Sequence, residues 1–131
     1  MNSQHAPSPL RSNLVVLRGA VTVEPQSRSL PSGAVAVQFD VRTVVDDGAA
    51  TPTPVPVPVS WIDPPPNDAG VVAVGEELVV IGTARRRFFR AGGATQSRTE
   101  VVAETVLSAK RTRSVQSAIA RALRVVGCPI G

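Results

Sequence analysis

The chain has 131 residues, of which 43% are hydrophobic, and this size and composition fit one domain with a single core and argue against wholesale disorder. Its net charge of +4 comes from 13 arginines and a single lysine against 10 acids, which is compatible with an anionic partner and equally with a simple solubility role. One cysteine and one histidine exclude an intramolecular disulfide framework and a cysteine-rich metal site, and they disfavour metal or nucleophilic catalysis.

Apolar runs are short throughout the chain, and none approaches the ~20 residues that span a bilayer. We therefore expect a soluble cytoplasmic protein with no membrane partner, no enzymatic activity and no cofactor.

Residues 1–12 are polar and include two prolines, which predicts a disordered leader. Segment 13–23 is rich in β-branched residues and predicts the first strand, in which Gly19 marks a bulge or bend. Arg28 follows in a short connection that we expect to be exposed.

Valines alternate with polar residues over 34–45, and this period of two predicts a strand whose buried face includes Phe39. After a loop, prolines at every second position keep 52–58 extended but remove alternate backbone donors. Any strand there must lie at a sheet edge or begin only near Val57, and a polyproline ligand for a partner domain is the competing interpretation. Segment 62–70 is predicted as a loop without a helix.

Two apolar runs, 75–89 and 99–109, flank a Gly-Gly turn and predict a hairpin. In an extended chain Arg85, Arg87 and Phe89 share one face. Guanidinium groups can meet phosphates while a base stacks on a neighbouring ring, which is what a platform for single-stranded nucleic acid needs.

Phe88 lies on the opposite face of the same predicted strand and is the better core candidate of the two adjacent rings. Apolar residues then recur at helical spacing over 114–126, where Ser114 could cap the helix and Gly127 and Pro129 would end it. The polar side of this helix carries arginines that we interpret as a solvated face, with a second set of phosphate contacts as the alternative. They are Arg113, Arg121 and Arg124.

Five strands with glycine bends, and a long irregular segment between the third and fourth, predict an all-β fold. The expected architecture is an OB-fold, a five-stranded Greek-key barrel of the oligonucleotide-binding type, with a short C-terminal helix. It divides the chain into a leader (1–12), the barrel (13–109) and a C-terminal segment (110–131).

The order of residues over 13–43 resembles the opening of bacterial single-stranded DNA-binding proteins. Both have an apolar strand beginning at Asn, then Gly, an acid-Pro pair, an Arg, a Pro-x-Gly turn and a strand ending near Thr. The stretch 75–102 resembles the last hairpin of that family, with Gly, Arg-x-Arg and an aromatic, then a polar turn and Thr-Glu-Val-Val. Together they cover more than half of 13–109, and the chain is similar to a divergent paralogue that lacks the family's acidic, Phe-ended tail for recruiting repair enzymes.

This resemblance implies that Phe89 and Trp61 stack on bases and that Arg28, Arg85 and Arg87 contact the strand. The alternatives are a core or dimer-interface position for Phe89 and a position at one end of the barrel for Trp61. The full set of candidate binding residues is Arg28, Arg42, Trp61, Arg85, Arg87, Phe89, Arg90 and Arg98.

Two departures from the family affect the expected affinity. Tryptophans that the family carries after the second strand and at the start of the third are absent here. Because each stacking platform is worth ~1–3 kcal/mol, binding should be weaker and should depend more on arginines, and therefore on salt.

The sequence thus predicts a nucleoid-associated protein that binds single-stranded DNA without sequence specificity in replication, repair or recombination, with RNA as an alternative ligand. The resemblance implies a homo-oligomer, a tetramer in preference to a dimer. The competing hypothesis is an adaptor on the same barrel that binds a protein partner.

Overall fold

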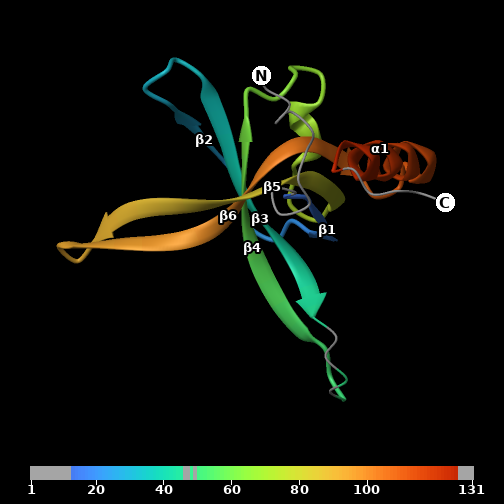
Figure 1. Cartoon of the computed structure of the whole chain (residues 1–131), viewed down its shortest axis with the longest axis horizontal. Coiled ribbons are helices and arrows are strands. Elements are labelled where there is room, and N and C mark those ends of the chain that lie inside the picture. The colour runs from blue at the N-terminus through green and yellow to red at the C-terminus, as the bar shows by residue number, and fades with distance from the viewer. Residues whose placement is uncertain (1–12, 46–47, 49, 127–131) are drawn as a thin grey trace, which may run out of the picture.

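The computed structural model describes residues 13–45, 48 and 50–126. The described chain is mostly β, with one α-helix near its end (Figure 1). The elements are β1 (Val15–Ala20), β2 (Gln26–Ser29), β3 (Val35–Val45), β4 (Thr53–Ile62), the 3-10 helix η3 (Ala69–Val71), β5 (Glu77–Ala91), β6 (Ala94–Ser108) and α1 (Thr112–Val125). The predicted leader and helix-ending residues (1–12, Gly127 and Pro129) lie outside the described residues. Among the helices described, none is long and apolar enough to cross a membrane.

The strands form one six-stranded sheet in the order β1-β5-β6-β4-β3-β2. A further pairing of β1 with β3, at Ala20 and Arg42, gives the sheet a ring-like pattern of hydrogen bonding. Neighbouring strands are antiparallel except β4 and β6, which pair in parallel from Val59–Val101 to Trp61–Ala103. Five strands complete the ring, and β2 pairs with β3 beside it.

The strand β2 was missing from the sequence prediction, which placed an exposed connection there. Its four residues are all exposed, so no alternation of apolar and polar residues marks it. It forms because its backbone pairs with β3, from Gln26–Gln38 to Ser29–Val35. Arg28 therefore sits on a strand, with its backbone held in register.

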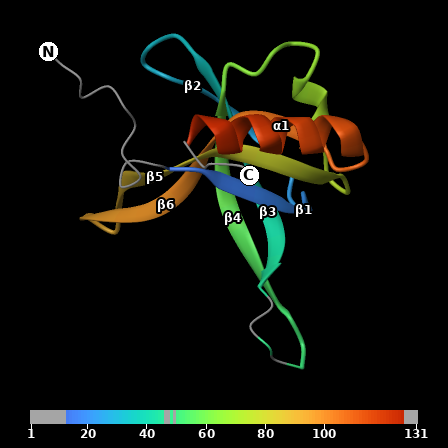
Figure 2. The same ribbon diagram turned by 45° about the vertical axis from the view of Figure 1, so that its right-hand side comes forward.

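The core consists of two clusters that lie on opposite faces of β5. The first fills the ring and includes Phe39, as predicted, together with Leu78 and Val80. The second contains Val79 and Ile81 of β5 and Ala118 of α1. Figure 2 shows α1 lying across the sheet beside β5. Since successive strand residues point to opposite faces, β5 is buried on both sides here. Four of the five apolar helix positions predicted from spacing belong to this cluster: Val115, Ala118, Ile119 and Ala122. The fifth, Val126, follows the last residue of α1.

The start of α1 differs from the prediction. The helix begins at Thr112, its N-cap residue is Arg111, and no side chain caps it. Ser114 lies inside the first turn, so the prediction that it caps the helix is wrong.

Two hairpins, β3–β4 and β5–β6, extend well beyond the ring (Figures 1 and 2). Phe88 lies on the second of these arms and is 67% exposed, so the prediction that it belongs to the core is wrong. It does point to the same side of the strand as Leu78 and Val80. The arm has left the ring by residue 88, however, and that side has no core to contact.

The proline-rich strand β4 is an edge over much of its length, as predicted. It pairs with β3 from Thr53 to Ile62 but reaches β6 only at Val59–Trp61. The prolines at 54, 56 and 58 have no N–H to donate. Because they occupy every second position, their backbone nitrogens all point to the same edge of the strand. Because the ladder with β3 is continuous, this must be the edge that faces away from β3. The missing donors there discourage pairing with another strand. Pairing with β3 also excludes a free polyproline helix in this structure.

Gly82 marks an irregularity that bends the long hairpin. The register of β5 and β6 shifts between Ile81 and Gly82. A Cβ at Gly82 would overlap the backbone carbonyl of Val102 on β6, so the two strands approach closely because no side chain is present.

We expect Gly82→Ala to lower the free energy of unfolding by roughly 1–3 kcal/mol, because the new methyl group must displace backbone rather than a flexible side chain. Urea denaturation measures the effect. Gly70→Ala is the matched control: a Cβ at Gly70 meets nothing within 4 Å, and the change should stay within about 0.5 kcal/mol. Equal stability of the two variants would contradict this account of the bend.

Candidate nucleic-acid interface

The register of the β5–β6 hairpin gathers polar and basic side chains on one face. Arg85 pairs with Glu100, Arg87 with Arg98, and Phe89 with Gln96. Residues directly opposite each other on antiparallel strands project to the same side of the sheet. The predicted face of Arg85, Arg87 and Phe89 is therefore present, and β6 adds one arginine and one acid to it.

Strands β2 and β3 bring further residues to the same surface. Arg28 lines a hollow together with Arg85 and Arg87, and Gln38 and Ser60 line it between them. Two adjoining hollows also contain Gln38 and Arg87, so the three merge into one surface depression. We refer to this depression as the basic groove; the residues used to define it are Arg28, Gln38, Ser60, Arg85, Arg87, Phe89 and Arg98.

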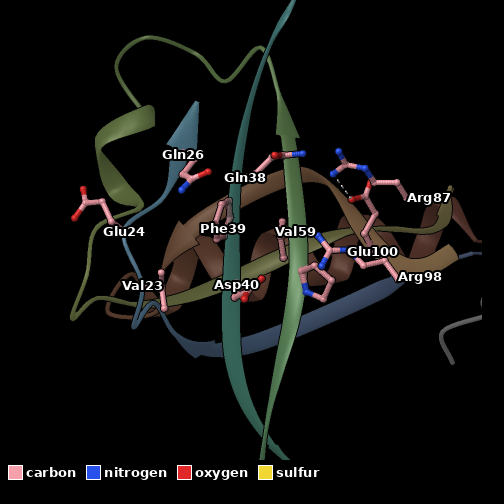
Figure 3. A pocket seen from close by; sticks show the side chains of 11 residues that line it. Val23, Glu24, Gln26, Gln38, Phe39, Asp40, Val59, Arg87, Arg98 and Glu100 are labelled. Carbon is pink, nitrogen blue, oxygen red and sulfur yellow. Dashed lines mark ion pairs between the residues drawn. The ribbon is translucent and has the colours of Figure 1, made fainter. Parts of the chain in front are cut away.

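Glu100 lies buried beneath the arginines of the basic groove and is 2% exposed. Its Oε2 accepts a hydrogen bond of 2.6 Å from Nη2 of Arg85. Its Oε1 is 3.7 Å from Nη1 of Arg87, and Figure 3 marks this ion pair with a dashed line. The carboxylate neutralises one of the two positive charges and restricts both guanidinium groups. Each guanidinium still has donors left over, because it carries five N–H groups in a planar fork.

Glu100 was not among the residues predicted from the sequence, although a signal for it existed. Pairing outward from the Gly92-Gly93 turn, Ala91 faces Ala94, and the same count places Glu100 opposite Arg85. An acid directly across a hairpin from an arginine is a favourable cross-strand pair.

Phe89 is 36% exposed and lines the part of the groove that also contains Gln38, Arg87 and Arg98. It is therefore not sealed in the core, and its exposed part lies beside two guanidinium groups. The two adjacent phenylalanines lie on opposite faces of β5, and only Phe89 lines the groove hollows.

Trp61 is 5% exposed and packs in the core cluster inside the ring. It pairs with Val37 on β3 and Ala103 on β6, which places its side chain on the inner face with theirs. This burial corrects the prediction that Trp61 stacks on bases, because the ring has no open face. The prediction overlooked how strongly a large ring contributes to the core of a chain with few aromatics.

Arg42 and Arg90 lie outside the basic groove. Arg42 is exposed on β3, opposite Pro56 and at the pairing with Ala20 of β1, and it lines none of the three merged hollows. Arg90 is near the tip of the other arm, where its Nη2 donates a hydrogen bond of 3.3 Å to the carbonyl of Gly93. The structure thus brings together Arg28, Arg85, Arg87 and Arg98 but leaves these two apart.

One end of the groove is acidic. Glu24 and Asp40 line the hollow that holds Arg87 and Arg98, and Figure 3 shows Glu24 on the far side of it from the two arginines. Carboxylates repel phosphates, so the phosphate path is expected to follow the arginine side. Within residues 13–45, 48 and 50–126, no cluster of three or more His, Cys, Asp or Glu residues could hold a metal ion.

We expect Arg85→Ala to destabilise the protein by on the order of 2 kcal/mol, since it leaves a buried carboxylate with only the longer Arg87 contact. Glu100→Gln should cost less, about 1 kcal/mol, because its amide oxygen can still accept a hydrogen bond. Chemical denaturation of the two single variants and the double variant gives their coupling, which should be at least about 0.5 kcal/mol. Arg86→Ala, on the opposite face, is the control and should be nearly neutral. Strict additivity would show that the pair contributes nothing.

Comparison with known proteins leaves the assignment to the geometry above. No family model matches this chain. No curated protein matches it either. The basic groove combines guanidinium groups, amide and hydroxyl side chains and one exposed ring.

Proposed function

We propose that this protein binds single-stranded DNA without sequence specificity, in the manner of bacterial single-stranded DNA-binding proteins. Arg28, Arg85, Arg87 and Arg98 hold phosphates, and Phe89 stacks on a base. The observation that carries the proposal is the basic groove, in which four arginines from three strands surround a depression that ends at an exposed ring. Guanidinium groups for the backbone and a ring for the bases are the two parts of a sequence-tolerant site.

The strand connections support an oligonucleotide-binding fold as part of this proposal. Counted in chain order, the strands of the ring are β1, β3, β4, β5 and β6. Such folds bind oligonucleotides on the face of their second and third strands and through the loops after the first and fourth. Gln38 and Ser60 belong to the second and third strands here, Arg28 to the first loop, and Arg87 and Phe89 to the fourth hairpin.

Affinity should be moderate and should depend on salt. With Trp61 in the core, Phe89 is the one predicted stacking ring that the groove presents, worth ~1–3 kcal/mol. Glu100 also cancels one charge of the Arg85–Arg87 pair. Most of the binding free energy is then expected from phosphate contacts, which release counterions and weaken as salt rises.

Assembly into a homo-oligomer, a tetramer in the first instance, is part of the proposal. In the described part of the chain β2 pairs on one side only, with β3, so its other edge is available to a second copy. The proline edge of β4 disfavours a competing association there. A role in DNA replication, repair or recombination follows from binding exposed single strands.

Phe89→Ala should weaken binding of labelled oligo-dT by roughly 5- to 150-fold, the equivalent of ~1–3 kcal/mol for one lost stacking platform. Fluorescence anisotropy at low salt measures the affinity. Phe88→Ala is the matched control, because the neighbouring ring is more exposed but lies on the other face of β5. Equal losses in both variants, or none in either, would rule out stacking on Phe89.

Arg98→Gln should reduce the slope of log affinity against log salt by about 0.7, the value for one phosphate contact on a single strand. The measurement is a salt titration of the same oligo-dT complex. Arg86→Gln removes the same charge from the opposite face and should leave the slope unchanged. If the two variants shift the slope equally, the effect is one of net charge and not of the groove. A wild-type protein that binds no oligo-dT at low salt would overturn the proposed function.

A further inference from the structure

The helix α1 presents a basic stripe that the basic groove does not use. Lys110 to Val125 contains five basic residues and no acid. Three arginines of α1 are exposed and lie on one side of the helix, because they are spaced by eight and three residues. They are Arg113, Arg121 and Arg124, and none of them forms an ion pair with a residue that the structure describes. Among the described residues, the stripe therefore carries positive charge that no ion pair offsets.

A hollow runs between this stripe and β6. Arg113 and Arg121 line it together with the hydroxyl groups of Thr105, Ser114 and Ser117, and no acid is among its lining residues. Arginine and hydroxyl side chains are the groups that contact phosphate oxygens in protein–nucleic acid interfaces. Leu107 and Ala118 form the rest of its lining.

The hollow and the basic groove lie on the same face of the β5–β6 pair. Thr83 points to the same face of β5 as Arg85, and it lines a second hollow with Arg121 and Thr105. That second hollow shares Thr105, Ala118 and Arg121 with the hydroxyl-lined one. Arg98 to Leu107 on β6 therefore follows one surface from groove to helix, a contour of about 30 Å at ~3.3 Å per residue.

We infer that a single strand leaving the basic groove continues along β6 onto α1, where Arg113 and Arg121 hold its phosphates. The inference rests on the proposed function and extends it to a second, helix-borne phosphate site. Glu104 lines the intermediate hollow beside Arg121, so the phosphates follow the side of that hollow away from the acid. The helix thus has two roles: its apolar side covers Val79 and Ile81, and its basic side lengthens the binding path.

The test compares the double variant Arg113→Gln/Arg121→Gln with the wild type on oligo-dT of two lengths, about 6 and about 16 nucleotides, near the ends of the usual site-size range. Both arginines are exposed, and circular dichroism checks that the variant folds. Affinity for the long oligonucleotide should fall about 2- to 30-fold, as for the loss of two exposed charge contacts. Its salt slope should fall by about 1.4, and affinity for the short one should not change.

The matched control is Arg86→Gln/Arg90→Gln, which removes the same charge from the opposite face of the β5–β6 arm. It should affect the two lengths equally. A helix variant that behaves like this control, or a wild type that binds both lengths equally, overturns the helix site but leaves the groove proposal standing. No wild-type binding to either length overturns the proposed function and this inference with it. If the wild type binds anionic phospholipid vesicles and the helix variant loses that binding while its DNA binding is unchanged, the stripe belongs to a membrane-surface site instead.

Discussion

The pairing of β5 with β6 is the constraint on which the rest of the structure depends. It runs from Leu78–Ser108 to Ala91–Ala94 and fixes which side chains share a face. Near the ring, alternation sends Leu78 and Val80 into the core and their neighbours under α1. Farther out, the same alternation places Arg87 on the groove side. A slip of one residue would exchange the two faces, so core, helix seat and basic groove are specified by one register.

Local signals made much of this register predictable. Gly92 and Gly93 adopt positive φ values of 60° and 81°, which the hairpin turn requires and which glycine adopts without strain. Two apolar runs around such a turn define a hairpin, and a period of two then sorts Arg85, Arg87 and Phe89 to one side. The edge position of the prolines and the apolar stripe of the helix followed equally from backbone chemistry and spacing.

What the sequence did not reveal depends on contacts between distant segments. The strand β2 exists because β3 offers a backbone to pair with, and nothing in its four exposed residues marks it. Trp61 lies in the core because β4 meets β6 in parallel, a pairing of segments some 40 residues apart. Phe88 is the opposite case. The face of β5 on which it lies was predicted correctly, but the β5–β6 arm extends beyond the ring at this residue, and its side chain is therefore exposed.

The position of Glu100 explains why the basic groove and the helix stripe should differ in character. A buried carboxylate between Arg85 and Arg87 lowers the charge of the groove and holds the two guanidinium groups near fixed positions, so the groove has a defined surface. The arginines of α1 are exposed and have no acid partner among the described residues, so they offer charge without such fixation. In the proposed complex, fixed donors beside a ring would favour one position for a nucleotide, whereas exposed charges along the helix would let the nucleic-acid backbone slide. A path that joins both would anchor a strand at Phe89 and leave its continuation mobile.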